Sequence, residues 1–317
     1  HRERAIVHLA TARRGNPVRR EGTRMRDTAC SERDGPATPI GAIAAEVFGQ
    51  EVEAAGTAGR LGYMGRLLVQ ATMPHSKPET NEVERRNGAL LLSMMAPRCV
   101  GLPYGTPPRH ILAWVTTEAV RTKSPELVLG DSYGAWLRAL GVPHGGEQYR
   151  LYQRGALSLF GTSITCTKVD EYGSQLEGVR VARRAQLWWD PKSPDQLGLW
   201  PSTVELHEDF FRALIDRPVP IDLGALRRLG RSPLALDLYA WLTYRFSYLR
   251  TPTSIPWEAL HCQFGSEYGR LRDFRRKAIL ALRRVASVYP AAGVEVKDTG
   301  LRLRPSPPHV RRLVPRN

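Results

Sequence analysis

The chain has 317 residues, enough for two domains of ordinary size, and its hydrophobic content of 42% and charged content of 24% are ordinary for a globular protein. The net charge of +15 and the pI near 10.1 are unusual, and they indicate a nucleic acid or another anionic surface as partner. No apolar run reaches about 18 residues, so the sequence predicts no membrane span.

The sequence also lacks the short motifs that would indicate an enzyme. It has no G-x-x-x-x-G-K-[ST], which argues against an ATPase of the P-loop type. It has no two histidines separated by one residue, which argues against the metal site of a rolling-circle nickase, and no H-E-x-x-H. The four cysteines are scattered without a C-x-x-C pair, so we expect free thiols in a reducing cytosol. These observations predict a protein without catalytic residues, metal or cofactor.

Residues 1–38 mix Arg, Gly, Pro, Thr and acidic residues without a lasting period, which predicts a disordered basic tail. Such a tail is either simply solvated or an arm that touches DNA, and the sequence favours neither. The chain begins with His, and Met25 is an alternative natural start, with residues 1–24 then read from upstream.

The stretch after the tail is less regular. Residues 40–48 and 59–73 are rich in Ala and Leu and predict two helices, although glycines between and within them weaken the pattern. Residues 73–88 predict a turn-rich link, and residues 89–95 predict a strand.

A compact block follows and predicts a winged helix-turn-helix. Its expected elements are a helix at 108–121, a strand at 126–130, helices at 132–141 and 146–160, and a hairpin of 162–169 with 177–189. Ser132 is suited to cap the second helix, which ends at Gly141. The hairpin would be the wing, and its basic residues are Lys168, Arg180, Arg183 and Arg184.

The helix at 146–160 offers Gln148, Arg150, Gln153 and Arg154 to DNA. Gly155 lies in its middle and its periodicity is irregular. Two interpretations therefore stay open, a helix that contacts DNA and a helix that mainly packs.

The same order of elements is repeated nearer the C-terminus. After a strand that leads into a helix at 203–216 and a short helix at 221–230, the sequence predicts the second set of elements. These are helices at 232–246, 256–265 and 267–289, a link or short strand at 251–255, and a hairpin of 293–298 with 300–305. The boundary between the two blocks falls either in the loop 190–198 or near 217–220.

The helix at 267–289 is the best candidate for contact with DNA. Its apolar side chains recur at steps of three and four residues, while Arg272, Arg276 and Arg283 fall on the opposite side with Arg270, Lys277 and Arg284 beside them. Only part of so long a helix fits into a major groove, so we expect the first half to contact bases. Arg283 and Arg284 would then meet phosphates or solvent. Arg275 falls inside the apolar side, where its stem can lie along the core with its head in solvent.

Several blocks in order resemble one known family. These are MPHSKP and RRNG upstream of the first block, GLPYGTPPRHILAWVTTEAVRTKSPELVLGDS (101–132), LWWDPK (187–192), LHEDFFRALIDRPVPIDL (206–223) and RSPLALDLYAWLTYR (231–245). They are similar to the RepA-type plasmid replication initiators. The resemblance implies two winged helices that bind directly repeated sites (iterons) in double-stranded DNA at a plasmid origin. It also implies that the duplex is opened with the host initiator, that the host replicative helicase is recruited, and that a homodimer forms in the bacterial cytoplasm.

The sequence therefore predicts an α+β, mainly helical chain with two tandem winged-helix domains. The expected divisions are a disordered basic tail at 1–38, an N-terminal winged-helix domain with preceding helices at 39–195, and a C-terminal DNA-binding winged-helix domain at 196–317. The predicted function is a non-enzymatic plasmid replication initiator. The alternative is a winged-helix transcriptional repressor without initiator activity.

Overall fold

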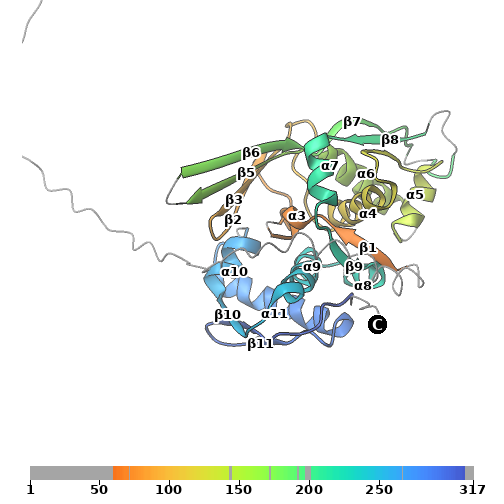
Figure 1. Ribbon diagram of the computed structural model, residues 1–317. Coiled ribbons are helices and arrows are strands. Elements are labelled where there is room, and N and C mark those ends of the chain that lie inside the picture. The colour runs from red at the N-terminus through yellow and green to blue at the C-terminus, as the bar shows by residue number, and fades with distance from the viewer. Residues whose placement is uncertain are drawn as a thin grey trace, which may run out of the picture. The chain divides into compact units, whose positions relative to one another are not determined.

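The computed structural model describes residues 60–70, 72–142, 145–170, 173–190, 193–196, 201–265 and 267–310 (Figure 1). The predicted tail at 1–38 and the predicted helix at 40–48 lie outside these residues. Within the described part, helices and strands alternate along the chain, so the expected mixture of helices and strands is confirmed. No described helix is long and apolar enough to cross a membrane.

The elements of the first half, in order, are β1 (Leu61–Met64), α3 (Arg66–Gln70), β2 (Glu82–Asn87), β3 (Leu90–Met95), α4 (Pro107–Thr122), β4 (Glu126–Val128), α5 (Tyr133–Ala139), α6 (Gly146–Phe160), β5 (Ser163–Asp170), β6 (Gly173–Arg180) and β7 (Ala182–Gln186). Those of the second half are β8 (Thr203–Leu206), α7 (Glu208–Ile215), β9 (Val219–Asp222), α8 (Leu223–Leu229), α9 (Pro233–Tyr248), β10 (Thr253–Pro256), α10 (Trp257–Phe264), α11 (Leu271–Val288), β11 (Val294–Val296) and β12 (Gly300–Leu303).

The predicted helices of both blocks are confirmed, and their caps explain where they begin. The Ser132 side chain accepts a hydrogen bond from the backbone nitrogen of Ala135 at 3.2 Å and caps α5. The Ser232 side chain accepts one from Ala235 at 3.4 Å and caps α9, whose first residue is Pro233. Such caps satisfy backbone donors that have no partner inside the helix, so they fix its first turn.

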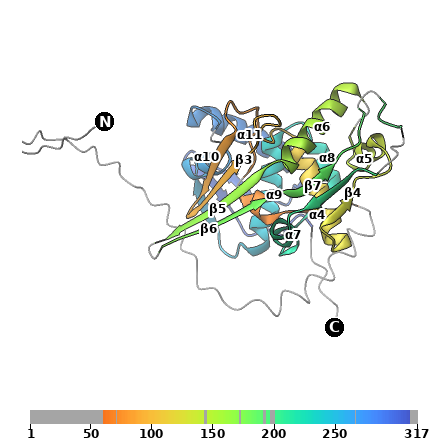
Figure 2. The ribbon, with the colours of Figure 1, turned by 90° about the horizontal axis from the view of Figure 1, so that it is seen from above.

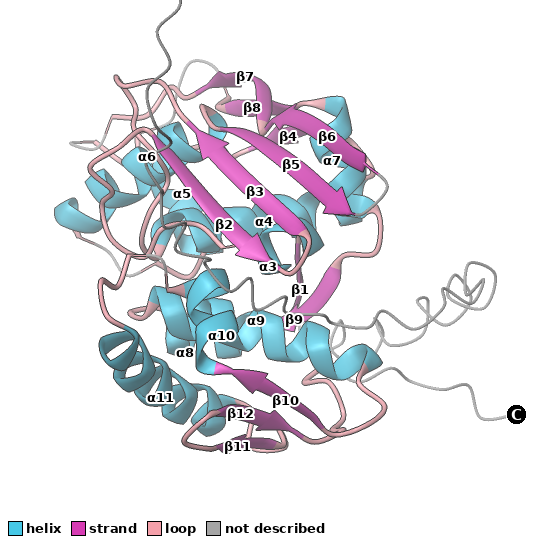
Figure 3. Ribbon diagram, turned by 90° about the vertical axis from the view of Figure 1, so that its left-hand side faces the viewer, coloured by secondary structure: helices cyan, strands magenta, loops and turns pink. Residues whose placement is uncertain are grey.

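Four antiparallel sheets accompany the helices. Their strand orders are β2-β3-β5-β6, β4-β8-β7, β1-β9 and β10-β12-β11. Figure 3 shows the four-stranded sheet above the C-terminal helices α9, α10 and α11. Its inner face carries Leu92, Met94 and Ile164, all buried, as the period of two along each strand requires.

Three expectations about the first half are wrong in their details. The predicted helix at 59–73 is divided into β1 and α3, because Gly62 lies in a strand paired with β9 and is packed against Leu223. The predicted link at 73–88 ends in β2, which pairs along its length with β3. The strand expected at 177–189 is interrupted, because β6 pairs with β5 whereas β7 pairs with β8 in another sheet.

The two blocks share one core. A continuous cluster of buried side chains includes Leu92 and Ile111 of the first half and Tyr239 and Phe274 of the second. Strand β1 pairs with β9, from Leu61 opposite Asp222 to Met64 opposite Val219. The proposed division at residue 195 stays a prediction.

The glycine in the middle of α6, Gly155, lies where this helix packs closely against α4. A Cβ atom at this position would lie 2.9 Å from Cβ of Pro107 and 3.4 Å from Cδ of Pro108. The glycine therefore lets α6 approach the beginning of α4 closely, which a longer side chain would prevent. The irregular periodicity of this helix reflects that contact.

Gly155→Ala is expected to lower the free energy of unfolding, even though alanine favours helices over glycine by about 1 kcal/mol. Overpacking against Pro107 costs about 1–3 kcal/mol and outweighs that gain. Urea unfolding measures the difference. Gly146→Ala is the matched control, because nothing lies within 4 Å of a Cβ atom at this first residue of α6. Equal stability of the two variants would contradict the packing argument.

Candidate nucleic-acid interface

A buried ion pair joins the first helices of the two blocks. Arg109 of α4 donates from Nε to Oδ1 and from Nη2 to Oδ2 of Asp237 on α9, each at 2.7 Å. The remaining donors of its guanidinium reach the carbonyl oxygens of Met73, Pro74 and Gly105 at 2.6–3.1 Å. The charge is thus both paired and fully hydrogen-bonded, which is what a buried arginine requires.

The segment that begins at Met73 continues the network toward α11. The Nε2 atom of His75 lies 2.8 Å from Oδ2 of Asp237, so the carboxylate has partners on two sides. The backbone nitrogens of His75 and Ser76 donate to the carboxylate of Glu267 at 2.7–3.0 Å. Glu267 also accepts from Nη2 of Arg85 at 2.5 Å, and the Arg85 side chain is fully buried. Residues 73–76 are therefore held from both sides.

The electrostatics of these groups follow from burial and pairing. Burial by itself raises the pKa of Asp237, but the neighbouring Arg109 and His75 outweigh it and hold that pKa below its usual value. Burial lowers the pKa of Arg85, and the charge of Glu267 opposes that shift. The two carboxylates are therefore occupied inside the protein and do not oppose an anion at its surface.

Helix α11 has the predicted two faces. Its buried residues are Phe274, Ala278, Ala281, Leu282, Val285 and Val288. Its exposed basic residues are Arg270, Arg272, Arg276, Lys277, Arg283 and Arg284. The helix begins at Leu271, later than expected, and Arg270 is its N-cap in an extended conformation. Arg276 lies 3.8 Å from Asp273 one turn earlier.

Arg275 has the intermediate position that its place on the helix suggested. Its side chain is 35% exposed, and Nη2 donates to Oδ1 of Asp298 at 2.7 Å. Its guanidinium carbon lies 5.6 Å from the centre of the Trp257 ring. The stem thus lies along the core while the head is paired at the surface.

Helix α6 presents fewer of its predicted residues. Arg150 and Arg154 are exposed, and Nη1 of Arg154 lies 3.3 Å from the hydroxyl of Tyr104. Gln153 is half-buried, and its Nε2 atom lies 3.5 Å from the carbonyl of Trp189, so it is turned toward the protein. The helix therefore packs through Gly155 and has an exposed basic edge, and its contact with DNA stays a prediction.

The two basic helices lie on one side of the molecule. In Figure 2 both α6 and α11 lie toward the upper edge, and in Figure 3 both lie toward the left. Helix α7 lies on the other side in both views.

The predicted wing residues of the first block do not form one surface. Lys168 is exposed on the sheet face that carries Ile164, whereas Arg180 pairs with Ser163 and lies on the opposite face. Arg183 and Arg184 belong to β7 and not to the hairpin, which corrects the expectation for them. Nε of Arg183 lies 2.5 Å from Oε1 of Glu205, so its charge is paired.

A basic group that the sequence analysis did not select lies on the second hairpin. Leu301 and Leu303 of β12 are buried, and the alternating Arg302 and Arg304 are exposed. Arg304 pairs with Glu295 of β11, and Nζ of Lys297 lies 3.3 Å from the same carboxylate. The period of two in GLRLRP was the signal that could have identified Arg302 and Arg304.

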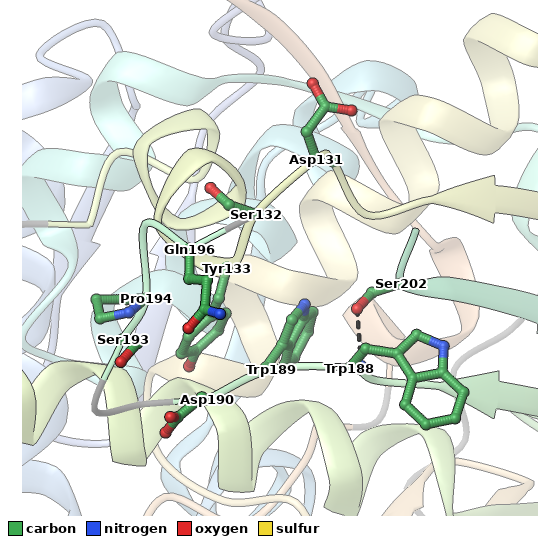
Figure 4. A pocket seen from close by; sticks show the side chains of 11 residues that line it. Asp131, Ser132, Tyr133, Trp188, Trp189, Asp190, Ser193, Pro194, Gln196 and Ser202 are labelled. Atoms are coloured by element: carbon green, nitrogen blue, oxygen red, sulfur yellow. Dashed lines mark hydrogen bonds between the residues drawn. The ribbon is translucent and has the colours of Figure 1, made fainter. Parts of the chain in front are cut away.

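An aromatic stack lies beside α5 and α6 (Figure 4). The ring of Trp189 lies 4.5 Å from Tyr133 and 4.7 Å from Trp136, whereas Trp188 is 57% exposed. One tryptophan therefore faces inward and one outward. The rings of Tyr133 and Trp189 line a shallow pocket. Asp131 and Asp190 line it too, and their negative charge is unfavourable to nucleic acid. No group of three His, Cys, Asp or Glu in the described residues could hold a metal ion.

Comparison with known proteins confirms the predicted resemblance. The family model for plasmid-encoded RepA protein matches residues 102–258. No curated protein matches the chain.

Two solved structures of RctB domains 2 and 3 are similar to it. One has 13% identity and a TM-score of 0.49 and covers 73% of this chain and 94% of that one. The other has 14% identity and a TM-score of 0.48, with 74% and 84% covered.

Asp237→Asn is expected to lower the free energy of unfolding at pH 7 by about 3–5 kcal/mol, because it leaves the charge of Arg109 buried without its counter-ion. The pKa of Asp237 is lower in the folded state than in the unfolded state. The stabilisation is therefore present above about pH 4 and is lost as the pH falls through the folded-state pKa. Urea unfolding at pH 7 and at lower pH measures both effects.

The matched control is Asp298→Asn, which breaks a pair whose carboxylate is 99% exposed, and little change is expected there. If Asp237→Asn had as small an effect, the buried pair would not hold the two blocks together.

Proposed function

Because residues 102–258 match the family of plasmid-encoded RepA proteins, we propose that the chain is a plasmid replication initiator that binds repeated sites in double-stranded DNA at a plasmid origin. The observation that carries DNA binding is the exposed basic face of α11. Cations on one exposed face release counterions from DNA phosphates, and arginine is the most common reader of guanine.

The order of elements supports a winged helix in the second block. The order α9, β10, α10, α11, β11 and β12 ends in a hairpin, and β10 joins the hairpin by pairing with β12. In this order a short strand lies between the first two helices and a hairpin follows α11, as a winged helix requires. Arg302 at the surface of β12 would accompany α11 on DNA.

The first block has the same order but a different sheet. Strand β4 pairs with β8, and the β5–β6 hairpin joins β3 instead. We propose that α6 makes fewer contacts with DNA than α11, through Arg150 and Arg154. Because the hairpin continues a larger sheet, its basic residues are weaker candidates for contact with DNA than those of α11.

Helix α11 is longer than the major groove is wide, so its two halves can make different contacts with DNA. Its 18 residues span about 27 Å, more than twice the roughly 12 Å width of a major groove. We propose that Arg270, Arg272, Arg276 and Lys277 contact bases or nearby phosphates. Arg283 and Arg284 then meet the DNA backbone or solvent.

We also propose that the protein is not an enzyme and acts in the bacterial cytoplasm, with the host initiator and the replicative helicase as partners. The family resemblance supports these partners and a homodimer, and no surface of the chain is assigned to them. A transcriptional repressor with the same helices is the alternative function.

Footprinting on DNA with tandem repeats separates the two functions. An initiator is expected to protect several repeats in phase and to make the adjacent duplex reactive to a probe of unpaired bases. Protection of a single palindromic site without opening would instead indicate the repressor. Nicking of the origin in the presence of magnesium would contradict a non-enzymatic role.

Arg272→Ala and Arg276→Ala are each expected to weaken binding at the specific site by about 1–3 kcal/mol, if these residues read bases. Fluorescence anisotropy with specific and unrelated duplexes measures the change. Arg283→Ala serves as the comparison on the same helix, with a smaller effect that is equal for all sequences. If Arg272→Ala and Arg276→Ala also weaken binding to all duplexes equally, the two arginines contact phosphates and the assignment of base contacts is wrong.

A further inference from the structure

A hollow of about 360 Å³ lies between α6 and the segment at 75–77. Its α6 wall consists of Leu151, Arg154, Gly155 and Ser158, which follow one another at steps of three, one and three residues along one side of the helix. The loop at 104–107 closes another side. Of its lining residues, Arg154 is already among the proposed DNA contacts of α6, whereas Lys77 is not.

The charges around the hollow are of one sign. Lys77 and Arg154 are both exposed at its wall, and none of its described lining residues is acidic. The nearest carboxylate of the buried network, Glu267, is engaged by Arg85 and by the backbone nitrogens of His75 and Ser76. An anion entering the hollow therefore meets cations and hydroxyl groups and no opposing charge.

A second observation concerns His75, which also lines the hollow. Its side chain is only 7% exposed, and its Nε2 atom contacts Asp237. Its Nδ1 atom is buried and has no hydrogen-bond partner. Buried polar atoms in folded proteins are nearly always bonded, so one residue of the lining has a polar atom whose bonding capacity is unused.

The place of the hollow suggests which ligand. Segment 75–77 is bonded to Glu267, only four residues before α11 begins, and the opposite wall is α6. The hollow thus lies between α6 and a segment that is bonded to the turn before α11. A duplex that contacts both helices would run past this segment.

We propose that this hollow binds the sugar-phosphate backbone of the duplex between the two places where α6 and α11 contact DNA. Lys77 and Arg154 each neutralise a phosphate, and the apolar floor at Leu151 contacts the sugars. This inference rests on the proposed DNA binding and adds a contact that carries no sequence information.

The test is the salt dependence of binding. Lys77→Ala and Arg154→Ala are each expected to weaken binding to specific and unrelated duplexes by the same factor. Each is also expected to make the slope of log Kobs against log salt concentration less negative by about 0.9, the value for one phosphate contact in B-form DNA. Lys77→Glu is expected to weaken binding further. Both residues are exposed, so a thermal melt checks that the variants fold.

The matched control is Arg212→Ala, which removes one exposed positive charge from α7, and this helix lies on the other side from α6 and α11 in Figure 2. Its slope is expected to equal that of the unaltered protein. If Lys77→Ala and Arg154→Ala match this control while Arg272→Ala loses binding, the hollow takes no DNA; this inference and the proposed contact of Arg154 then fail, and DNA binding through α11 stands. Loss confined to the specific duplex, or lost origin activity with unchanged DNA binding, also overturns it. If the unaltered protein binds no duplex at all, the proposed function itself fails.

Discussion

The guanidinium of Arg109 lies inside the protein with all three of its nitrogen atoms bonded, to both oxygens of Asp237 and to three backbone carbonyl groups. Removing either partner would leave a charge in a medium that cannot solvate it, so the two helices that carry them are held at a fixed separation. The same pair determines the path of residues 73–76, because two of the carbonyl groups belong to that segment. The turn before α11 is bonded to this segment through Glu267.

The arginines of the chain have two different roles, in buried ion pairs and on the exposed surface. Arg85 and Arg109 are buried and compensated by Glu267 and Asp237, so they contribute to the fold and not to the field outside it. The exposed cations of α11 and of the second hairpin have partners at the surface where they are paired, as Arg276 is with Asp273 and Arg304 with Glu295. A count of arginines in the sequence therefore overestimates the exposed positive charge, and it does not show on which helices or strands the exposed arginines lie.

The helices were predictable because their signals are local. Caps such as Ser132 and Ser232 and the spacing of apolar residues determine α5, α9 and α11 almost without reference to the rest of the chain. Strand partners were not predictable. A period of two shows which face of a strand is buried, but nothing near β4 indicates that it pairs with β8, or near β1 that it pairs with β9.

The candidate site shows the same division. The basic face of α11 was predictable from the sequence. The placement of Lys168 and Arg180 on opposite faces of the sheet was not, because the hairpin was expected to form an isolated wing. Arg109 and Asp237 looked like ordinary charged residues on helices, since burial of a charge depends on a partner 128 residues away. The hollow beside α6 could not be inferred at all, because three separate segments form it.

The pairing of β1 with β9 and the bonds from His75 to Glu267 have a consequence for synthesis of the chain. The partners of His75 and Ser76 lie 192 and 191 residues further along, so these segments emerge from the ribosome long before their partners exist. Contacts of such long separation form slowly, since a large loop must close before they stabilise anything. Folding of this protein is thus completed only after most of the chain has been made, and β1 and the segment at 75–76 lack their partners until then.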